Sequence, residues 1–364
     1  MEFKIKQSVL AEALGAVQGA LEKKTTIPVL SNVLIESIGE GNINITATDL
    51  DITIRRTVEA DVIKAGAISV DARKLGDIVR SSPDIELHFE REDNAWVKMR
   101  AGKSKTRFAG VDRDKYPNTA ANKTTPIKLS ATFFSKLVAG TTFAVTNDAT
   151  RFTLSGCKLE VENGCARMIS TDGHRVCIRE FEVADKSAKL SALIPKKALS
   201  EIAKITTGDI SVGADKEHFF AESDGQIVIA RLLMGSFPNY EMLIPKDVAN
   251  TVECISGDLR AAIRRASFLS DGTNRSVRLN IAEGEIRVTA QSAGDGEVDE
   301  FVEADYSGEP IVLGFQWPYL MDVFGVGNSD ARAVIGFEDE HKQALITFAD
   351  DESFRYIIMP LRVH

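Results

Sequence analysis

The stretch Phe3-Lys4-Ile5, followed by the amphipathic segment 7–21, decides the fold, because the same arrangement of a short alternating strand and a helix returns twice. The second copy is Ile127-Lys128-Leu129 before 130–143, and the third is Val252-Glu253-Cys254-Ile255 before 256–269. The starts lie about 125 residues apart, which indicates three repeated domains rather than one large core.

Each copy continues with strands of alternating polar and apolar residues, joined by glycine or asparagine turns, which are typical of antiparallel hairpins. A second helix follows in each copy. The six predicted helices are 7–21, 72–81, 130–143, 195–206, 256–269 and 315–326. Aperiodic linkers near 120–126 and 246–251 separate three predicted domains, 1–122, 126–246 and 250–364. The expected fold class is α+β, with two helices on antiparallel sheets in each domain.

The composition narrows the class of protein. The chain has 364 residues, a formal net charge of −9 and 44% hydrophobic residues, as an ordinary globular protein does. This acidic balance argues against a protein that holds nucleic acid by bulk attraction. No apolar stretch reaches the roughly 18–20 residues of a membrane span, and the first residues alternate charged and apolar side chains, unlike a secretory signal. We therefore expect a cytoplasmic protein with no membrane partner.

The residues that could carry chemistry form no recognisable site. The four cysteines, Cys157, Cys165, Cys177 and Cys254, make no CxxC pair and have no histidine at zinc-site spacing. We expect them to be reduced and structural, and we expect no metal and no other cofactor. Asp172 and His174 could form an acid–base pair, but the sequence offers no nucleophile or third group near them, so no catalytic residue is predicted.

Charge is segregated between the predicted helices and the rest of the chain. The helices hold ten basic and five acidic side chains, a net charge of +5, so the remainder of this −9 chain carries −14. The cations are Arg73, Lys74, Arg80, Lys136, Lys196, Lys197, Lys204, Arg260, Arg264 and Arg265. Lysine and arginine are good helix formers, so they could simply cover a solvated face. Alternatively, the helices line one surface that faces a polyanion and attracts phosphates without reading bases.

Six segments, in the order of the chain, carry a resemblance to a known family. They are Ile27-Pro28-Val29-Leu30-Ser31-Asn32, Ala47-Thr48-Asp49-Leu50, Thr171-Asp172-Gly173-His174-Arg175, Phe237-Pro238-Asn239-Tyr240, Ser276-Val277-Arg278-Leu279 and Met359-Pro360-Leu361-Arg362. With them the chain resembles, from end to end, the bacterial sliding clamps, the beta subunits of DNA polymerase III. The resemblance implies a non-catalytic processivity factor. Its head-to-tail homodimer would form a ring of six domains, with helices inside and sheets outside, around double-stranded DNA.

The resemblance also implies contacts with DNA and with a second copy of the chain. Lys24 is carried over from the family as a DNA contact, and the helix cations expected to join it are Arg73, Arg80, Lys136, Lys196, Lys197, Lys204, Arg260 and Arg264. Phe108, Phe268 and Leu269 are expected to meet across the subunit boundary, with ordinary core burial as the alternative for each. Such a contact joins unlike surfaces, and two copies related by a twofold axis close the ring.

A second implied site is an apolar cleft that receives short linear peptides. Its expected partners are the DNA polymerase III alpha subunit, the clamp loader, and other DNA polymerases and repair proteins. The expected residues are Leu154, Thr171, Gly173, His174, Arg175, Val176, Pro238, Met242, Leu243, Ile357, Met359, Pro360, Leu361 and Arg362. Methionine suits such a cleft because its thioether adapts to different side chains. The alternative for the chain end is a last core strand.

Three positions depart from the family pattern. Met242 stands where relatives often carry arginine, which makes the cleft more apolar. Phe152 and Thr153 stand where relatives often have paired tyrosines, so a DNA contact through that loop is in doubt. The function that competes with a clamp is a peptide-binding scaffold that does not act on DNA. A scaffold of this kind would also have the peptide cleft, but its helix cations would have no function.

Overall fold

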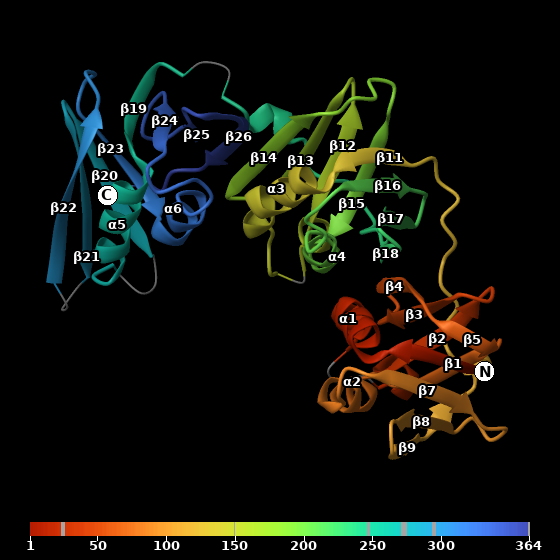
Figure 1. Cartoon of the computed structure of the whole chain (residues 1–364). Helices are drawn as coiled ribbons and strands as arrows, with labels where there is room; N and C mark the ends of the chain where they lie inside the picture. The colour runs from red at the N-terminus through yellow and green to blue at the C-terminus, as the bar shows by residue number, and fades with distance from the viewer. Residues whose placement is uncertain (23–25, 149, 246–247, 271–274, 293–295, 363–364) are drawn as a thin grey trace. The chain divides into compact units, whose positions relative to one another are not determined.

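The computed structural model describes residues 1–22, 26–148, 150–245, 248–270, 275–292 and 296–362. The chain forms two compact units (Figure 1). Unit 1 consists of Met1–Phe134 and Lys197–Leu232, and unit 2 consists of Ser135–Lys196 and Leu233–His364. The middle one of the three predicted domains therefore contributes residues to both units.

Unit 1 contains two antiparallel sheets. One has the order β5-β1-β7-β8-β9, and the other has the order β10-β6-β2-β3-β4-β18-β17-β16-β11. The strands of the first are β5 (Asp61–Lys64), β1 (Glu2–Lys6), β7 (Glu86–Arg91), β8 (Val97–Ala101) and β9 (Ser104–Phe108). The strands of the second are β10 (Gly110–Val111), β6 (Ala67–Asp71), β2 (Asn32–Ile38), β3 (Asn42–Thr48), β4 (Ile52–Glu59), β18 (Gln226–Arg231), β17 (His218–Ser223), β16 (Asp209–Ala214) and β11 (Ile127–Ser130).

Unit 2 is built on one twelve-stranded antiparallel sheet. Its order is β15-β12-β13-β14-β26-β25-β24-β19-β22-β21-β20-β23. The strands are β15 (Leu190–Pro195), β12 (Gly156–Glu162), β13 (Cys165–Thr171), β14 (Arg175–Glu182), β26 (Asp351–Ile358), β25 (Ala344–Phe348), β24 (Arg332–Phe337), β19 (Asn250–Ile255), β22 (Gly296–Asp305), β21 (Glu285–Ser292), β20 (Ser276–Ala282) and β23 (Ile311–Gln316).

The described residues contain the six predicted helices, two in each repeat, so the α+β fold with helices on antiparallel sheets is confirmed. They are α1 (Gln7–Val17), α2 (Ala72–Ser81), α3 (Ala131–Thr141), α4 (Lys196–Ile202), α5 (Ser256–Ser267) and α6 (Trp317–Val323). In unit 1, α1 packs on α2 and on β3 and β4; in unit 2, α5 packs on α6 and on β19 to β22. Leu10, Leu14 and Val17 are buried, as their spacing predicts.

Most helices are shorter than predicted, and sheet pairing is the reason at two of the starts. Pro195, predicted in the first turn of a helix, ends β15 opposite Gly156. Phe315, also predicted to begin a helix, pairs in β23 with Val277. Helix ends were also misplaced: α4 stops at Ile202, so Lys204 lies beyond it, and α5 stops before Phe268 and Leu269. Only 72–81 has the predicted bounds.

The middle repeat belongs to both units because each of its sheets extends a neighbour's sheet. In unit 1, β18 pairs antiparallel with β4 of the first repeat. In unit 2, β14 pairs antiparallel with β26 of the third repeat. Backbone hydrogen bonds therefore continue from one repeat into the next, a contact between repeats that hydrophobic periodicity does not predict.

The start of α2 supports a prediction about stability. The Asp71 carboxylate accepts a hydrogen bond of 2.8 Å from the backbone N–H of Lys74, which caps the helix. We expect Asp71→Ala to lower the free energy of unfolding by about 1 kcal/mol, because it leaves that N–H without its partner. Lys74→Ala keeps the backbone N–H and is the matched control. Urea denaturation followed by circular dichroism measures both; equal stabilities would contradict the cap.

The cysteines are free, and three of them are buried. Burial raises the pKa of Cys157 to about 12 and that of Cys254 to about 12 as well. Thiols of such high pKa stay protonated and are poor nucleophiles. In the part of the chain that the structure describes, no helix has the length and hydropathy to span a membrane.

Candidate functional site

The segments predicted to form the peptide cleft come together in unit 2. Val176 of β14, Ile357 of β26 and Tyr240 of the 3₁₀ turn Tyr240–Leu243 share one buried apolar cluster. Two backbone hydrogen bonds hold the chain end beside them: Met359 N–H donates to the carbonyl of His174 (3.0 Å), and Leu361 N–H donates to that of Gly314 (2.8 Å). Met359 and Leu361 are therefore held by backbone hydrogen bonds to two different parts of unit 2.

The predicted cleft residues divide into a buried set and an exposed set. Leu154, Thr171, Arg175, Val176 and Ile357 are buried, whereas Gly173, His174, Pro238, Met242, Leu243, Met359 and Arg362 are exposed and Pro360 and Leu361 lie between. Leu154 lies in the 3₁₀ turn Phe152–Leu154. Because the first set is buried, the second set is the one that a partner can contact.

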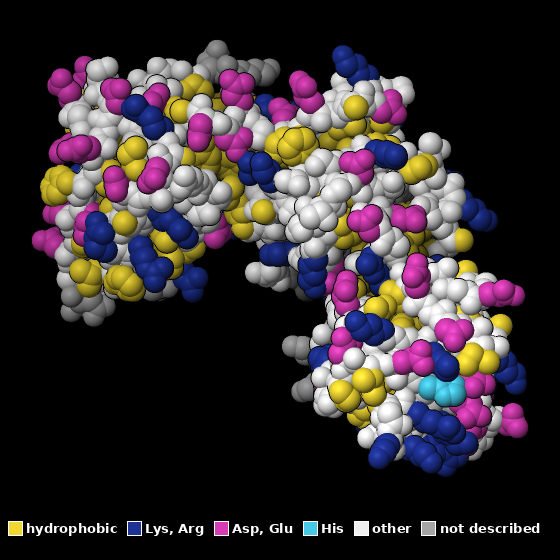
Figure 2. All heavy atoms as spheres, viewed as in Figure 1, with side chains coloured by type: hydrophobic (Ala, Val, Ile, Leu, Met, Phe, Trp, Pro, Cys, Tyr) yellow, Lys and Arg dark blue, Asp and Glu magenta, His cyan; other side chains and the backbone are white. Residues whose placement is uncertain are grey.

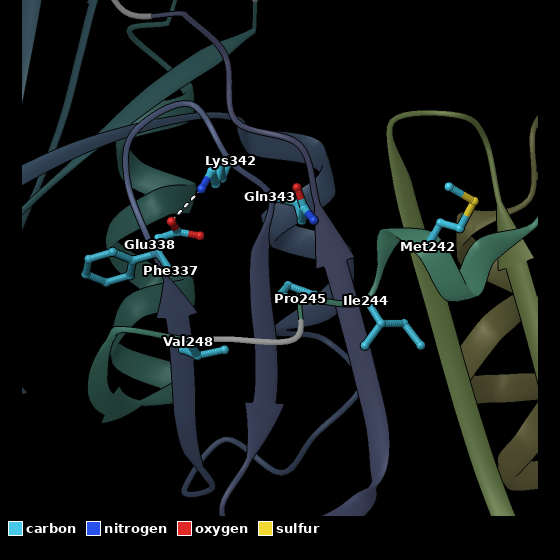
Figure 3. A pocket seen from close by; sticks show the side chains of 8 residues that line it. All are labelled: Met242, Ile244, Pro245, Val248, Phe337, Glu338, Lys342 and Gln343. Carbon is cyan, nitrogen blue, oxygen red and sulfur yellow. Dashed lines mark hydrogen bonds and ion pairs between the residues drawn. The ribbon is translucent and has the colours of Figure 1, made fainter.

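Methionines are among the most exposed apolar side chains of unit 2. Met242 is 78% exposed and Met359 is 45% exposed, and the sequence analysis missed Met234, which is 69% exposed. A pocket of about 240 Å³ adjoins Met242. Figure 3 shows Ile244, Pro245 and Val248 along the linker, next to the β24–β25 turn with its Glu338–Lys342 ion pair. Flexible thioethers at the edge of an apolar cluster fit a surface that accepts varied side chains.

Asp172 shapes the turn between β13 and β14. Its carboxylate accepts hydrogen bonds from the backbone N–H groups of His174 (3.0 Å) and Arg175 (3.2 Å) and from Arg175 Nε (3.0 Å). Gly173 follows with φ +90°, which glycine adopts without strain. The equivalent Asp49 of unit 1 likewise accepts from two backbone N–H groups, those of Asp51 and Ile52. The carboxylate holds a turn that presents His174, a structural use rather than acid–base chemistry.

Arg175 is the most heavily bonded residue of the region, with a side chain only 6% exposed. Besides Asp172, its guanidinium donates to Asp322 of α6 (2.7 Å), to the Tyr356 hydroxyl (3.2 Å) and to the carbonyl of Phe143 (2.8 Å). It also lies 4.3 Å from the centre of the Tyr319 ring. Burial raises the pKa of Tyr356, whose hydroxyl donates to the carbonyl of Tyr319 (3.1 Å). Arg175 therefore holds the cleft turn, β26 and α6 in one arrangement.

A second polar network fixes the start of the linker, and the sequence analysis missed it. The Tyr240 hydroxyl donates to Glu160 (2.8 Å) and accepts from Arg167 (3.3 Å). Arg167 also pairs with Glu180 (2.7 Å), which Arg355 of β26 contacts as well (2.7 Å). The network's members come from separate strands and from the turn at Tyr240, so no local sequence pattern indicated it. The network sets the position from which Met242 and Leu243 project.

The predicted DNA-binding cations of the helices are exposed, except Lys196 at the start of α4, which is partly buried. They differ in whether a carboxylate pairs with them. In unit 1, Arg73 and Arg80 lie on α2, where Arg80 pairs with Asp77 (2.7 Å). Lys197 pairs with the buried Asp49, and Lys204 pairs with Glu201 (2.6 Å). Within the described ranges, Arg73 has no carboxylate partner. Of these four unit 1 cations, Arg73 is therefore the one whose charge is free to bind an anion. Lys24 lies outside the described residues.

In unit 2 the cations of two helices converge. Lys136 of α3 and Arg260 of α5 line one hollow of about 520 Å³, together with Arg179, Phe143 and Asp322. Figure 2 shows Lys and Arg side chains gathered over the part of unit 2 that Figure 1 labels α5 and β21. Arg260 and the exposed Arg264 have no carboxylate partner in the described part of the chain. This helix surface offers cations to a phosphate chain.

The three residues expected at a subunit boundary differ in exposure. Phe108 is 7% exposed and packs inside unit 1. Phe268 follows α5 and is 75% exposed, and Leu269 is partly exposed. A phenylalanine this open, next to a helix end, is an apolar side chain that a partner can cover.

Comparison with known proteins decides the family. The three family models of the DNA polymerase III beta subunit match in order: the N-terminal domain over 1–120, the central domain over 128–239 and the C-terminal domain over 241–362. The beta sliding clamps of Pseudomonas aeruginosa and Vibrio cholerae are 30% and 29% identical to the chain, with full coverage of both sequences. The chain belongs to the sliding clamp family.

Solved structures agree with this assignment. The DNA polymerase III beta subunit of Pseudomonas aeruginosa matches with a TM-score of 0.95 and 29% identity, and the polymerase sliding clamp of Bacillus subtilis matches with 0.95 and 26%. Both matches cover all of both chains. The predicted family and three-domain fold are thus confirmed. The chain is a non-catalytic DNA polymerase processivity factor, which has DNA and polymerase as its partners.

Proposed function

We propose that two copies of this chain close head to tail into a ring around double-stranded DNA, and that the ring tethers polymerases through the cleft in unit 2. The observation that carries the proposal is that an acidic chain exposes cations on the helices of both units. A few arginine–phosphate contacts give weak, sequence-independent association that permits sliding. A closed ring around the DNA keeps the protein on the duplex, which such weak binding alone does not.

The cleft is the tether in this proposal. Its exposed set, from Gly173 to Arg362, would accept short linear peptides of the DNA polymerase III alpha subunit, the clamp loader, other DNA polymerases and repair proteins. A polymerase that releases the primer end then stays beside it at high effective concentration. We further propose the domain boundaries 1–122, 126–246 and 250–364 and an action in the cytoplasm.

Retention on circular DNA tests the enclosure. We expect clamps placed on a nicked circle by a clamp loader to remain bound through gel filtration, and to leave when one restriction cut makes the DNA linear, because a ring slides off a free end. A scaffold that binds only peptides would bind neither form of DNA. Equal retention on linear and circular DNA would contradict the ring.

The arginines that have no carboxylate partner in the described part of the chain support a prediction about the salt dependence of DNA binding. We expect the triple change Arg73→Ala, Arg260→Ala and Arg264→Ala to weaken binding to a linear duplex and to lower the slope of log K against log salt by about 2–3, since each phosphate contact contributes roughly 0.9. The control is Arg80→Ala with Lys204→Ala, whose cations already pair with carboxylates. An unchanged slope in the triple variant would show that these arginines do not face DNA.

A further inference from the structure

Arg175 connects two sites of unit 2 that the proposed function uses separately. One is the hollow of about 520 Å³ that α3, α5 and α6 line, whose walls include Phe143 and Asp322. The other is the cleft turn, which Asp172 holds closed and which presents His174. On the hollow side the Arg175 guanidinium donates to Asp322 Oδ2 (2.7 Å) and to the Phe143 carbonyl (2.8 Å). On the cleft side it donates to Asp172 Oδ2 (3.0 Å).

These contacts leave the guanidinium little freedom to move. A further acceptor, the Tyr356 hydroxyl of β26, lies 3.2 Å away, and only 6% of the Arg175 side chain is exposed. The guanidinium is a planar fork, so the directions of its N–H groups are fixed relative to one another. An acceptor that moves on the hollow side therefore tilts the fork and shifts the hydrogen bond that Asp172 receives on the cleft side.

Asp322 is the acceptor on which the hollow can act. Its side chain is 41% exposed, and it shares the hollow with Lys136 of α3 and Arg260 of α5. The Arg260 guanidinium reaches the end of α6, because a Cβ on Gly325 would lie 3.1 Å from Arg260 Nη2. Cations at this place attract the Asp322 carboxylate in competition with Arg175.

A phosphate in the hollow changes this balance. It neutralises the cations that line the hollow and repels the Asp322 carboxylate, which then keeps Arg175 as its ion-pair partner. The inference rests on the proposed function, in which DNA supplies the phosphate and a client peptide fills the cleft. We infer that Asp322 is a positioning residue, which acts through Arg175 and makes the peptide affinity of the cleft depend on whether a phosphate occupies the hollow.

The two sites should strengthen each other. When Asp322 is held on Arg175, the cleft turn and β26 are fixed before the peptide arrives, so less conformational freedom is lost on binding. Phosphate should therefore tighten peptide binding, and by linkage the peptide should tighten phosphate binding by the same factor. A client would then bind a ring that surrounds DNA more tightly than an empty ring.

Unit 1 builds the same turn without this connection. Asp49 accepts hydrogen bonds from the backbone N–H groups of the second and third residues after it, as Asp172 does in unit 2. The third residue is Ile52 in unit 1, where unit 2 has Arg175. Lys197 of α4 pairs directly with Asp49 instead. The link through a hollow aspartate and a buried arginine therefore belongs to the unit that carries the cleft.

Peptide affinity with and without DNA tests the coupling. A fluorescent clamp-binding peptide of a DNA polymerase III alpha subunit is titrated with the full-length chain, alone and with an excess of a short linear duplex. The titrations are made at low salt, where phosphate contacts are strong. We expect the duplex to lower the dissociation constant of the peptide by about fivefold in the wild type, the lower end of typical coupling between two sites.

Two variants separate coupling from structure. Asp322→Asn should weaken peptide binding and bring the ratio of the two dissociation constants close to one, because asparagine has no charge for the hollow to act on. Arg260→Ala should tighten peptide binding in the absence of duplex, because it removes a cation that competes with Arg175. Asp258→Asn is the matched control: Asp258 is an exposed aspartate of α5 that does not line the hollow, and this variant should keep the wild-type ratio.

The outcomes distinguish this inference from the proposed function. An Asp322 with a merely structural role would weaken peptide binding equally with and without duplex, and that result would overturn the coupling. A wild-type ratio of one, with the labelled duplex shown to be bound by its anisotropy, would also overturn it and leave the proposed function standing. A wild-type chain that binds neither peptide nor duplex would overturn both.

Discussion

Replacing Arg175 with methionine should lower the free energy of unfolding of unit 2 by about 3–5 kcal/mol, the usual effect of removing one partner from a buried ion pair. Methionine fills part of the volume but removes the guanidinium donor of the Phe143 carbonyl and the Tyr356 hydroxyl, and it leaves the largely buried Asp172 with only its two backbone donors. Asp322 is half exposed and can regain water, so most of the loss arises at the other three groups.

Tryptophan fluorescence measures this in unit 2 alone. The chain has two tryptophans, Trp96 in unit 1 and Trp317 in α6, so a Trp96→Phe background leaves Trp317 as the reporter. Arg332→Met is the matched control, because Arg332 forms an exposed ion pair with Glu253 and should cost less than about 1 kcal/mol. Arg175→Lys should fall between them, since one ammonium cannot serve four acceptors in a fork. Equal urea midpoints for both methionine variants would refute the role of Arg175.

Deleting 359–364 should reduce the affinity for the clamp-binding peptide of a DNA polymerase III alpha subunit by about 100-fold or more, because it removes Met359 and the anchored backbone beside His174. The dimer should remain, since β26 ends at Ile358 and residues 359–362, the described part of the deleted segment, lie outside the strands of the sheet. Isothermal titration with the peptide and sedimentation of the same sample measure the two results.

A substitution separates the cleft from any general effect of truncation. Met359→Asp keeps the chain length and should lose most of the peptide affinity, because it puts a charge where an apolar side chain docks. Arg362→Ala, at an exposed position, should change affinity only a few-fold. Unchanged affinity in both the deletion and Met359→Asp would show that the peptides bind elsewhere.

Local sequence patterns predicted the helices and strands well where interactions within the same short segment determine the structure. The spacing of Leu10, Leu14 and Val17 is that of a helix with one buried face, and the predicted bounds 72–81 are those of α2. The patterns failed at Pro195 and Phe315, where a strand partner outweighed helix signals. The apolar character of Leu154 agrees with its burial but did not indicate the 3₁₀ turn Phe152–Leu154 in which it lies.

The candidate site was predicted as a set of segments but not as a structure. The motif around Asp172 and the apolar chain end were visible in the sequence, and both lie at the site. The sequence could not separate buried Arg175 from exposed His174, one residue away. Nor could it find the Tyr240–Arg167–Glu180 network, whose members come from distant strands.

The amino-acid order by itself determined the threefold repeat, the helices and their excess of cations, since these follow from spacing and composition within short segments. Only the tertiary structure decided which cations have carboxylate partners and which cleft residues are buried. Those properties depend on contacts between residues far apart in the chain, which spacing and composition within a short segment do not determine.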